Sequence, residues 1–346
     1  MFHKVNSNST LMGVIRTYPE DFQVDEIQQF TPSGSGEHVW LHIQKTGENT
    51  DWVAGLLAKI AEVPRKDVSY AGMKDRYAVT SQWFSVQMPG RKAPDWQASL
   101  PESIILLDEH RHDRKLKRGA LKGNAFKLII RELTNDKSDK TVEDDLKSSI
   151  SRIVGQGIPN YFGEQRFGRD GENIRKASQW FRGELKVKSR SKRSIYLSAA
   201  RSWIFNHILS ARIEEGTWNK AVQGDVFMIN GSKSCFNELV DDEIIQRIDE
   251  QSLHPTGALW GRGELLSETL VAELESKVSR EFEVLCDGLE KNGLKQERKS
   301  LRLNVQDLKF SAMTGDTVCL TFTLPAGAYA TSVLNEIGEF SSYKKD

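Results

Sequence analysis

Alternating, strand-like stretches near both ends of the chain, with a helical middle between them, limit most strongly how this sequence can fold. The stretch "HVWLHIQKTG" alternates apolar and polar residues from Val39, and "TVCLTFTLPAG" does the same from Thr317. A period of two is typical of a half-buried strand. The final stretch is expected to pair with residues 301–310 through a turn at 314–316. The two ends therefore predict sheet structure on both sides of a helical region.

The middle of the chain reads as helices. The stretches "LSAARSWIFNHILSARI" and "LVAELESKVSREFEVLCDGL" each repeat apolar residues at helical spacing. At 346 residues the chain also exceeds the roughly 250 residues that one core usually supports. The sequence thus predicts an α+β protein with two domains. Residues 157–302 are expected to form an inserted domain, and residues 1–156 and 303–346 to form the other domain from both chain ends.

One shorter helix is predicted between the first strands. In "NTDWVAGLLAKIAEVP", Asn49 or Thr50 can cap the helix, an apolar face follows, and Pro64 can end it. The stretches "SQWFSVQM" and "NAFKLIIREL" follow as further strands.

Composition limits the class of protein. Apolar residues make up 38% and charged residues 28% of the chain, which is typical of a soluble globular protein. The apolar runs are too short to cross a bilayer, and the N-terminal stretch lacks the apolar core of a secretory signal. Cys235, Cys286 and Cys319 are far apart, so neither a disulfide framework nor a zinc ribbon is indicated. We expect a cytoplasmic protein without membrane association.

Motifs for metals, cofactors and serine hydrolases are weak. His110 and His112 could supply two metal ligands, but no third ligand stands at a recognisable spacing. No G-x-S-x-G elbow occurs, and the glycines of "NYFGEQRFGRDGEN" lack a Walker lysine and a dinucleotide-binding context. We therefore expect no metal and no cofactor.

Basic residues are concentrated locally although 48 basic and 48 acidic residues balance over the chain. They cluster in "RKLKRGALK" and in "KVKSRSKRS", and a local cluster can attract a phosphate backbone whatever the net charge. Solvated loops that keep the protein in solution are an equally good reading of either run taken alone.

The most informative short stretch is "GMKDR", in which Lys74 and Arg76 flank Asp75. Nearby positive charge favours the ionised form of a carboxylate. The stretch is therefore either a surface ion cluster or a carboxylate nucleophile kept ionised.

Aromatic and amide residues in short, glycine-rich stretches are further candidates. Phe22 begins an alternating run, Asn124 and Phe126 stand at the start of a strand, and Tyr329 follows a glycine turn. Each has a structural alternative: core packing for the rings and turn formation for the asparagine. Loop positions held on a rigid scaffold are also where binding residues concentrate.

These short blocks together resemble the TruD family of tRNA pseudouridine synthases. The resemblance spans nearly the whole chain and rests on six blocks in order: "YPEDFQVDEI", "AGMKDRYAVTSQWFSV", "RKLKRGALKGNAFKL", "GIPNYFGEQRFGRDGEN", "LSAARSWIFN" and "LPAGAYATSVLNEI". It implies an α+β pseudouridine synthase catalytic domain with a mixed or antiparallel sheet, interrupted by an inserted α+β TRUD domain. It also implies an isomerase that converts uridine 13 in the D arm of tRNA to pseudouridine.

The resemblance implies roles for individual residues. Asp75 matches the family's nucleophile, which would attack C1′ or C6 of a flipped-out uridine or assist glycal formation. Arg16 falls at a basic position that could pair with Asp75. Lys74 and Arg76 would help to keep the carboxylate ionised or would hold nearby phosphates. The positions that match the base pocket are Phe22, Asn124, Phe126 and Tyr329. The family commonly has phenylalanine where this chain has Tyr329, whose hydroxyl could add a hydrogen bond.

The implied partner is tRNA, with no cofactor and no obligatory protein partner. A basic channel on both domains would hold the RNA backbone, and the candidate contacts are Lys115, Lys117, Arg118, Lys122, Arg190, Lys192 and Arg193.

Two other functions stay open at this point. An RNA-binding protein could keep the scaffold without the chemistry. A glycosidase acting on a small nucleoside could use Asp75 with Asp25 or Glu26 as a second acid.

Overall fold

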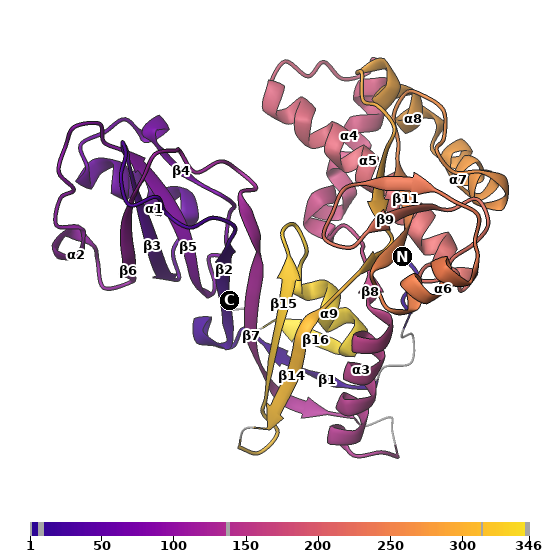
Figure 1. The fold of residues 1–346 in the computed structure, drawn as a ribbon, viewed down its shortest axis with the longest axis horizontal. Coiled ribbons are helices and arrows are strands. Elements are labelled where there is room, and N and C mark those ends of the chain that lie inside the picture. Colours follow the sequence, from indigo (N-terminus) through magenta and orange to yellow (C-terminus); the bar gives the residue numbers. More distant parts are fainter. Residues whose placement is uncertain (1, 6–9, 136–138, 313, 343–346) are drawn as a thin grey trace. The chain divides into compact units, whose positions relative to one another are not determined.

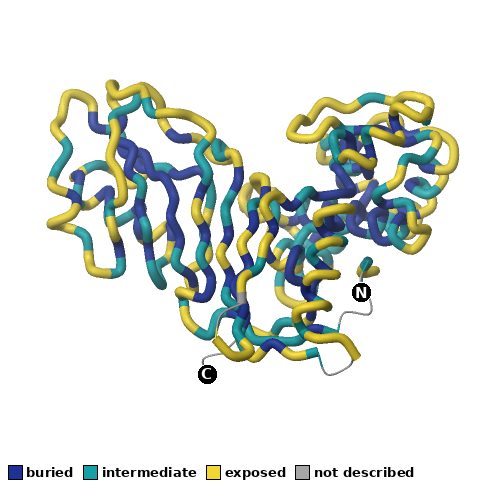
Figure 2. The backbone as a smooth tube through the Cα atoms, turned by 60° about the horizontal axis from the view of Figure 1, so that its bottom comes forward, coloured by how far each residue is buried: buried dark blue, intermediate teal, exposed yellow. Residues whose placement is uncertain are grey.

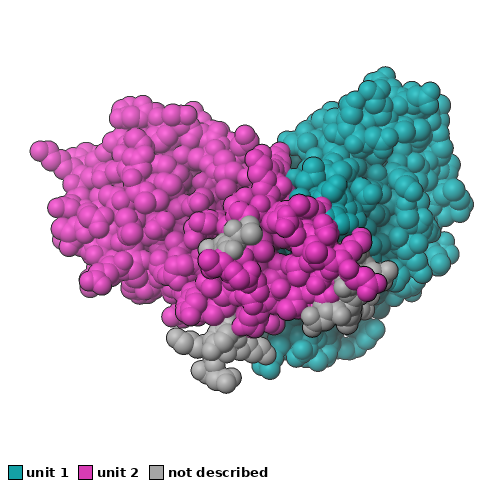
Figure 3. Space-filling view, turned by 90° about the horizontal axis from the view of Figure 1, so that it is seen from below, with its two compact units in different colours: residues 1–9, 148–305, 331–337 teal, residues 10–147, 306–330, 338–346 magenta. Residues whose placement is uncertain are grey.

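The computed structural model describes residues 2–5, 10–135, 139–312 and 314–342, which fall into two compact units (Figures 1 and 3). The sheet unit consists of residues 10–147, 306–330 and 338–346. The helical unit consists of residues 1–9, 148–305 and 331–337. No helix in the described part of the chain is long and apolar enough to cross a membrane.

A mixed sheet of ten strands builds the sheet unit (Figure 1). The strands are β1 Met12–Ile15, β2 Phe22–Gln28, β3 His38–Thr46, β4 Val68–Tyr70, β5 Val79–Gln87, β6 Ile104–His112, β7 Leu121–Thr134, β14 Gln306–Ala312, β15 Val318–Pro325 and β16 Glu339–Ser342. Seven of them follow the order β14-β15-β7-β2-β5-β3-β6, while β1 pairs with β7 and β16, and β4 pairs with β5. The pairs β2–β5 and β1–β16 are parallel, so the predicted mixed sheet built from both chain ends is confirmed.

Helix α1 (Thr50–Ile60) covers part of one face of this sheet, where Leu57 and Val53 pack in the same core as Leu41 and Phe84. Asn49 caps the helix as predicted, because its side chain accepts a hydrogen bond from the backbone of Asp51. Figure 2 shows buried residues running along the strands and exposed residues in the connecting loops.

Helix α1 ends before the stop that the sequence predicts at Pro64. Its last residue is Ile60, and Glu62 then takes a left-handed φ of 52°. A right-handed helix cannot continue through that conformation.

The predicted C-terminal hairpin is confirmed in part. Strands β14 and β15 pair antiparallel, and the inward side chains of β15 are buried as expected. The predicted partner strand was too long, however, because residues 302 and 303 leave the hairpin and form β13 (Arg302–Leu303). Strand β13 pairs with β8 (Ile158–Pro159) in the helical unit instead.

Helices surround a small sheet in the helical unit. The helices of the chain after α1 are α2 Trp96–Ser99, α3 Val142–Gln156, α4 Glu172–Phe181, α5 Arg190–Glu214, α6 Asp242–Asp249, α7 Thr269–Glu281, α8 Glu283–Lys291 and α9 Ala330–Ile337. The small sheet has the order β10-β9-β11-β12, with bounds β9 Val226–Ile229, β10 Cys235–Asn237, β11 Leu253–Leu259 and β12 Glu297–Ser300. Its main core joins Ile204 and Ile208 of α5 to Leu285 and Leu289 of α8.

Two predictions for this region need correction. Helix α5 begins at Arg190, before the stretch "LSAARSWIFNHILSARI" from which a helix was predicted, and its first turn includes part of the basic run. The long helix predicted from "LVAELESKVSREFEVLCDGL" is divided at Phe282, whose φ of −120° and ψ of 34° are not helical. The ring of Phe282 contacts the ring of His207 on α5, with centroids 4.5 Å apart.

We propose that residues 157–302 are the inserted domain, with residues 1–156 and 303–346 forming the domain that they interrupt. Support comes from β8 and β13, which pair with each other where the chain enters and leaves this stretch.

Candidate active site

The stretch "GMKDR", residues 72–76, forms the loop between β4 and β5 of the sheet unit. Two fully buried polar side chains hold its backbone. Gln82 on β5 donates from Nε2 to the carbonyl of Gly72 at 3.0 Å. The Thr50 hydroxyl on α1 accepts from the backbone of Lys74 at 3.1 Å and donates to Gln82 at 2.9 Å. Because buried polar groups need their partners, these contacts fix the loop on the sheet.

Asp75 is held by Arg16. The guanidinium Nη2 donates to Oδ2 of Asp75 at 2.7 Å, while Oδ1 accepts no hydrogen bond from the described residues. Arg16 also lies over the ring of Phe22, 4.1 Å from the centroid. One oxygen of the carboxylate is therefore anchored, and the other stays open in a side chain that is 45% exposed.

Arg16 follows β1 with a φ of 59°, a left-handed conformation that is uncommon for a residue other than glycine. Such conformations persist where the surrounding structure holds them, and they concentrate at functional sites.

Lys74 has its direct contacts with Glu26 and Asn124, and its effect on the ionisation of Asp75 stays a prediction. Its Nζ lies 3.0 Å from Oε2 of Glu26 and donates to Oδ1 of Asn124 at 2.6 Å. The Lys74 and Glu26 side chains are 6% and 1% exposed. Burial raises the pKa of Glu26, and the charge of Lys74 opposes that rise. Lys74 thus compensates a buried carboxylate and orients an amide, and Arg76 instead donates to the carbonyl of Gly47.

Phe22 and Phe126 form a packed floor beside this group. Their centroids are 6.4 Å apart in an edge-on contact, and Phe126 stacks on Phe322 at 5.2 Å. Phe22 is 3% exposed and Phe126 is 8% exposed, so neither offers an open face to a base in this state.

Tyr329 stands between β15 and α9. It follows β15, whose Leu324 is opposite Asn124 in the sheet, and its side chain is exposed. No hydrogen bond or ring contact joins it to the other candidates within the described ranges. The structure brings together Arg16, Phe22, Lys74, Asp75, Asn124 and Phe126.

The two acids that a glycosidase could use beside Asp75 are each engaged by another residue. Asp25 lies on the opposite face of β2 from Glu26, because side chains alternate along a strand, and it accepts a hydrogen bond from Ser81 at 2.6 Å. Glu26 is buried against Lys74. This geometry does not support the glycosidase alternative.

Comparison with known proteins identifies the family. The family model described as tRNA pseudouridine synthase D (TruD) matches residues 1–180 and 172–337. The chain belongs to the TruD family. A tRNA pseudouridine synthase D from Methylococcus capsulatus is 47% identical over 338 residues, covering 97% of this chain and 94% of the relative. One from Hydrogenovibrio crunogenus is 45% identical over 327 residues, covering 94% and 93%.

A solved structure supports the TruD fold. A Methanosarcina mazei protein assigned as tRNA pseudouridine synthase D matches with a TM-score of 0.73, covering 97% of this chain and 95% of that one. At 22% identity this match shows the fold alone. The fold class and the enzyme class implied by the resemblance, an isomerase acting on uridine in tRNA, are thus confirmed by the comparisons together.

The basic residues of this TruD chain lie in both units. Those before and at the start of β7 are exposed, and they are Lys115, Lys117, Arg118 and Lys122. Those on the first turn of α5 are exposed too, and they are Arg190, Lys192 and Arg193. Their contact with RNA stays a prediction.

Lys45 is a site residue that the sequence reasoning missed. It lies on β3, is fully buried, and donates from Nζ to the carbonyls of Asp75 and Glu48, both at 2.8 Å. Burial lowers the pKa of Lys45 to about 8. A signal was present, because Lys45 continues the inward series Val39, Leu41 and Ile43 of an alternating strand. A lysine at such a position needs buried acceptors.

We expect Lys45→Met to slow single-turnover isomerisation about tenfold to a hundredfold. The carbonyls of Asp75 and Glu48 lose their donor, and the backbone of Asp75 is no longer held. Leaving a buried acceptor without its hydrogen bond costs about 1–3 kcal/mol. The measurement is the single-turnover rate at saturating tRNA, with tRNA Kd measured in parallel. Lys59→Met, at an exposed position on α1, is the matched control and should match the wild type. Weaker tRNA binding and lower stability with an unchanged rate would argue against a positioning role.

Proposed function

We propose that this chain converts uridine 13 in the D arm of tRNA to pseudouridine, with Asp75 as the nucleophile. The observation that carries the proposal is the pairing of Asp75 with Arg16 beside the floor of Phe22 and Phe126. A carboxylate held as an anion needs no separate base to become a nucleophile.

The reaction is an internal exchange of bonds. The bond from uracil N1 to ribose C1′ breaks, the base turns, and C5 bonds to C1′. C5 loses its proton and N1 gains one, so the product is an isomer and no oxidant or group donor is required. Asp75 acts through the oxygen that Arg16 leaves free, attacking C1′ or C6 or assisting glycal formation.

A uridine within folded RNA must leave its stack to reach Asp75, which costs a few kcal/mol. Stacking on an aromatic ring returns about 1–3 kcal/mol per base. Tyr329 has the exposed ring for this role, whereas Phe22 becomes available only when Arg16 moves away from it. The amide of Asn124, oriented by Lys74, supplies hydrogen bonds to the base.

The neighbourhood of Asp75 must also exclude water while the base and the sugar are separated, since hydrolysis would otherwise compete. We propose that the exposed lysines and arginines before β7 hold phosphates of the tRNA and set its register. The protein would act in the cytoplasm, where tRNA is available.

The test is release of tritium from tRNA labelled at uracil C5, followed by carbodiimide primer extension to locate the product. We expect release by the wild-type protein, with the product at position 13 and no release from that position in a tRNA that carries cytidine there. Product at another uridine, or unchanged release from the cytidine-13 tRNA, would contradict the proposed target.

A further inference from the structure

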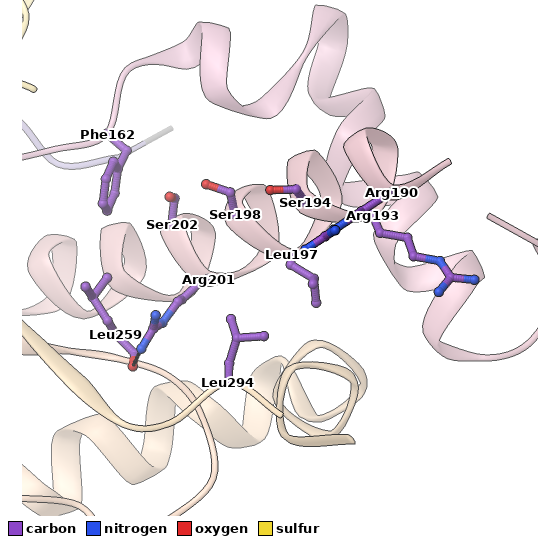
Figure 4. Close-up of a pocket in the computed structure, with 10 residues that line it drawn as sticks. All are labelled: Phe162, Arg190, Arg193, Ser194, Leu197, Ser198, Arg201, Ser202, Leu259 and Leu294. Carbon is purple, nitrogen blue, oxygen red and sulfur yellow. Dashed lines mark hydrogen bonds between the residues drawn. The ribbon is translucent and has the colours of Figure 1, made fainter. Parts of the chain in front are cut away.

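None of the contacts described above for Asp75 comes from the block "NYFGEQRFG", residues 160–168. It belongs to the helical unit, and one of its residues, Phe162, lines a pocket of about 520 Å³ there (Figure 4). Helix α5 supplies the pocket's longest wall, and Leu259 and Leu294 complete it. The volume lies within the usual range for small-ligand pockets, roughly 300–1,000 Å³.

The lining is cationic. Residues of α5 enter it at successive turns, and they are Arg190, Arg193, Ser194, Leu197, Ser198, Arg201 and Ser202. No carboxylate is among the lining residues. Arg201 is paired with Glu297 at 3.0 Å, but Arg190 and Arg193 have no ion-pair partner among the described residues. Two uncompensated guanidinium groups beside hydroxyls are suited to a phosphate.

An aromatic ring stands at the other end of the lining. Phe162 is partly exposed, and it is held by Arg166 and Lys299, whose cationic atoms lie 5.2 and 4.7 Å from its centroid. Arg166 in turn donates to Ser198 at 2.5 Å, which ties the block to α5. Phe205 meets the Phe162 ring edge-on at 5.5 Å. The ring is therefore fixed in place before any ligand arrives.

Phosphate-binding groups and a fixed ring in one pocket match the two parts of a nucleotide. Arginines and hydroxyls suit its phosphate, and the apolar side chains of Leu259 and Leu294, with the exposed part of Phe162, suit its base. An inorganic anion would use only the arginines and the hydroxyls. We propose that this pocket binds one unpaired nucleotide of the substrate RNA, distinct from the uridine that is isomerised. The inference rests on the proposed function, because it takes tRNA as the substrate.

The first test is Arg190→Gln/Arg193→Gln. We expect Kd and KM for tRNA to rise about tenfold or more, and the slope of log K against log salt to become shallower by about 0.7 for each phosphate that the variant no longer neutralises. The matched control is Lys277→Gln/Arg280→Gln on α7, with the same spacing of three and the same reduction in charge. Both of its residues are exposed and outside the pocket lining. Equal effects of the two pairs would overturn the proposal.

A photo-reactive benzoylphenylalanine at position 194 provides the second test. We expect a cross-link at one tRNA nucleotide other than position 13, retained with the cytidine-13 tRNA. No cross-link, or one at position 13, would overturn the proposal. So would saturable binding of UMP that is abolished in Arg190→Gln/Arg193→Gln while the tRNA Kd stays the same, because the occupant would then be a free nucleotide.

The wild-type protein is assayed for tritium release in the same preparations. Absence of release there would refute the proposed function itself. Normal tritium release together with equal effects of Arg190→Gln/Arg193→Gln and Lys277→Gln/Arg280→Gln would refute only the proposed nucleotide pocket.

Discussion

Asp75→Asn should reduce pseudouridine formation by at least about 10⁴-fold, as expected when a nucleophile is removed. The amide keeps the shape of the side chain but has no anionic oxygen to attack the nucleoside. The pair of Asp75 with Arg16 is partly exposed, so its removal should cost at most about 1 kcal/mol of stability. Tritium release under single-turnover conditions measures the effect, and tRNA Kd should change by no more than about twofold.

A matched control separates this effect from a general loss of negative charge. Asp307→Asn changes an exposed carboxylate on β14 of the same unit and should leave the rate unchanged. Full activity of Asp75→Asn would show that the nucleophile is a different group. Loss of tRNA binding together with activity would show that Asp75 acts in substrate binding.

Lys74→Met should destabilise the protein by about 3–5 kcal/mol at pH 8, because Glu26 is left buried without its compensating charge. The effect should depend on pH with a definite sign. Burial raises the pKa of Glu26 in the folded chain above its ordinary value of 4.5, and the removal of Lys74 raises that pKa further. Folding then favours the protonated carboxyl, so the deficit relative to the wild type grows as pH rises from about 5 to 8. Urea unfolding at several pH values measures it.

The double variant Lys74→Met/Glu26→Gln provides the control. It removes both charges, so we expect it to recover most of the missing stability and to show no additional pH dependence. A deficit in Lys74→Met that is constant across this pH range would mean that the lysine acts through packing or through Asn124. Failure of the double variant to recover would point to the same conclusion.

Local sequence pattern was enough to find the loop at residues 72–76 and its charged residues, but not to predict how the charges pair. Neighbours in sequence suggested that Lys74 and Arg76 would help to keep Asp75 ionised, and only the family resemblance suggested Arg16 as its partner. The fold brings Arg16 from the end of β1 to Asp75, and turns Lys74 towards Glu26 on β2. Such pairings depend on strand order and register, which a period of two does not specify.

Helix boundaries show the same limit. The cap at Asn49 is a local interaction and was predicted correctly. The division of the later helix at Phe282 was not predicted, because the apolar positions continue at helical spacing through that residue. What the spacing does not show is that the Phe282 ring contacts His207 on another helix. Tertiary packing overrides helical periodicity at that residue.

The pairing of β1 with β16 has a consequence for biosynthesis. These strands belong to opposite ends of the chain, and β15, which flanks β7 on the side away from β2, is also made late. While the ribosome is still translating, β7 has one unpaired edge beside Asn124, and unpaired edges recruit strands from other molecules. This edge of β7 is therefore open to aggregation from the time that β7 is synthesised until β15 follows and pairs with it, and chaperones that cover nascent β edges would act on it in that interval.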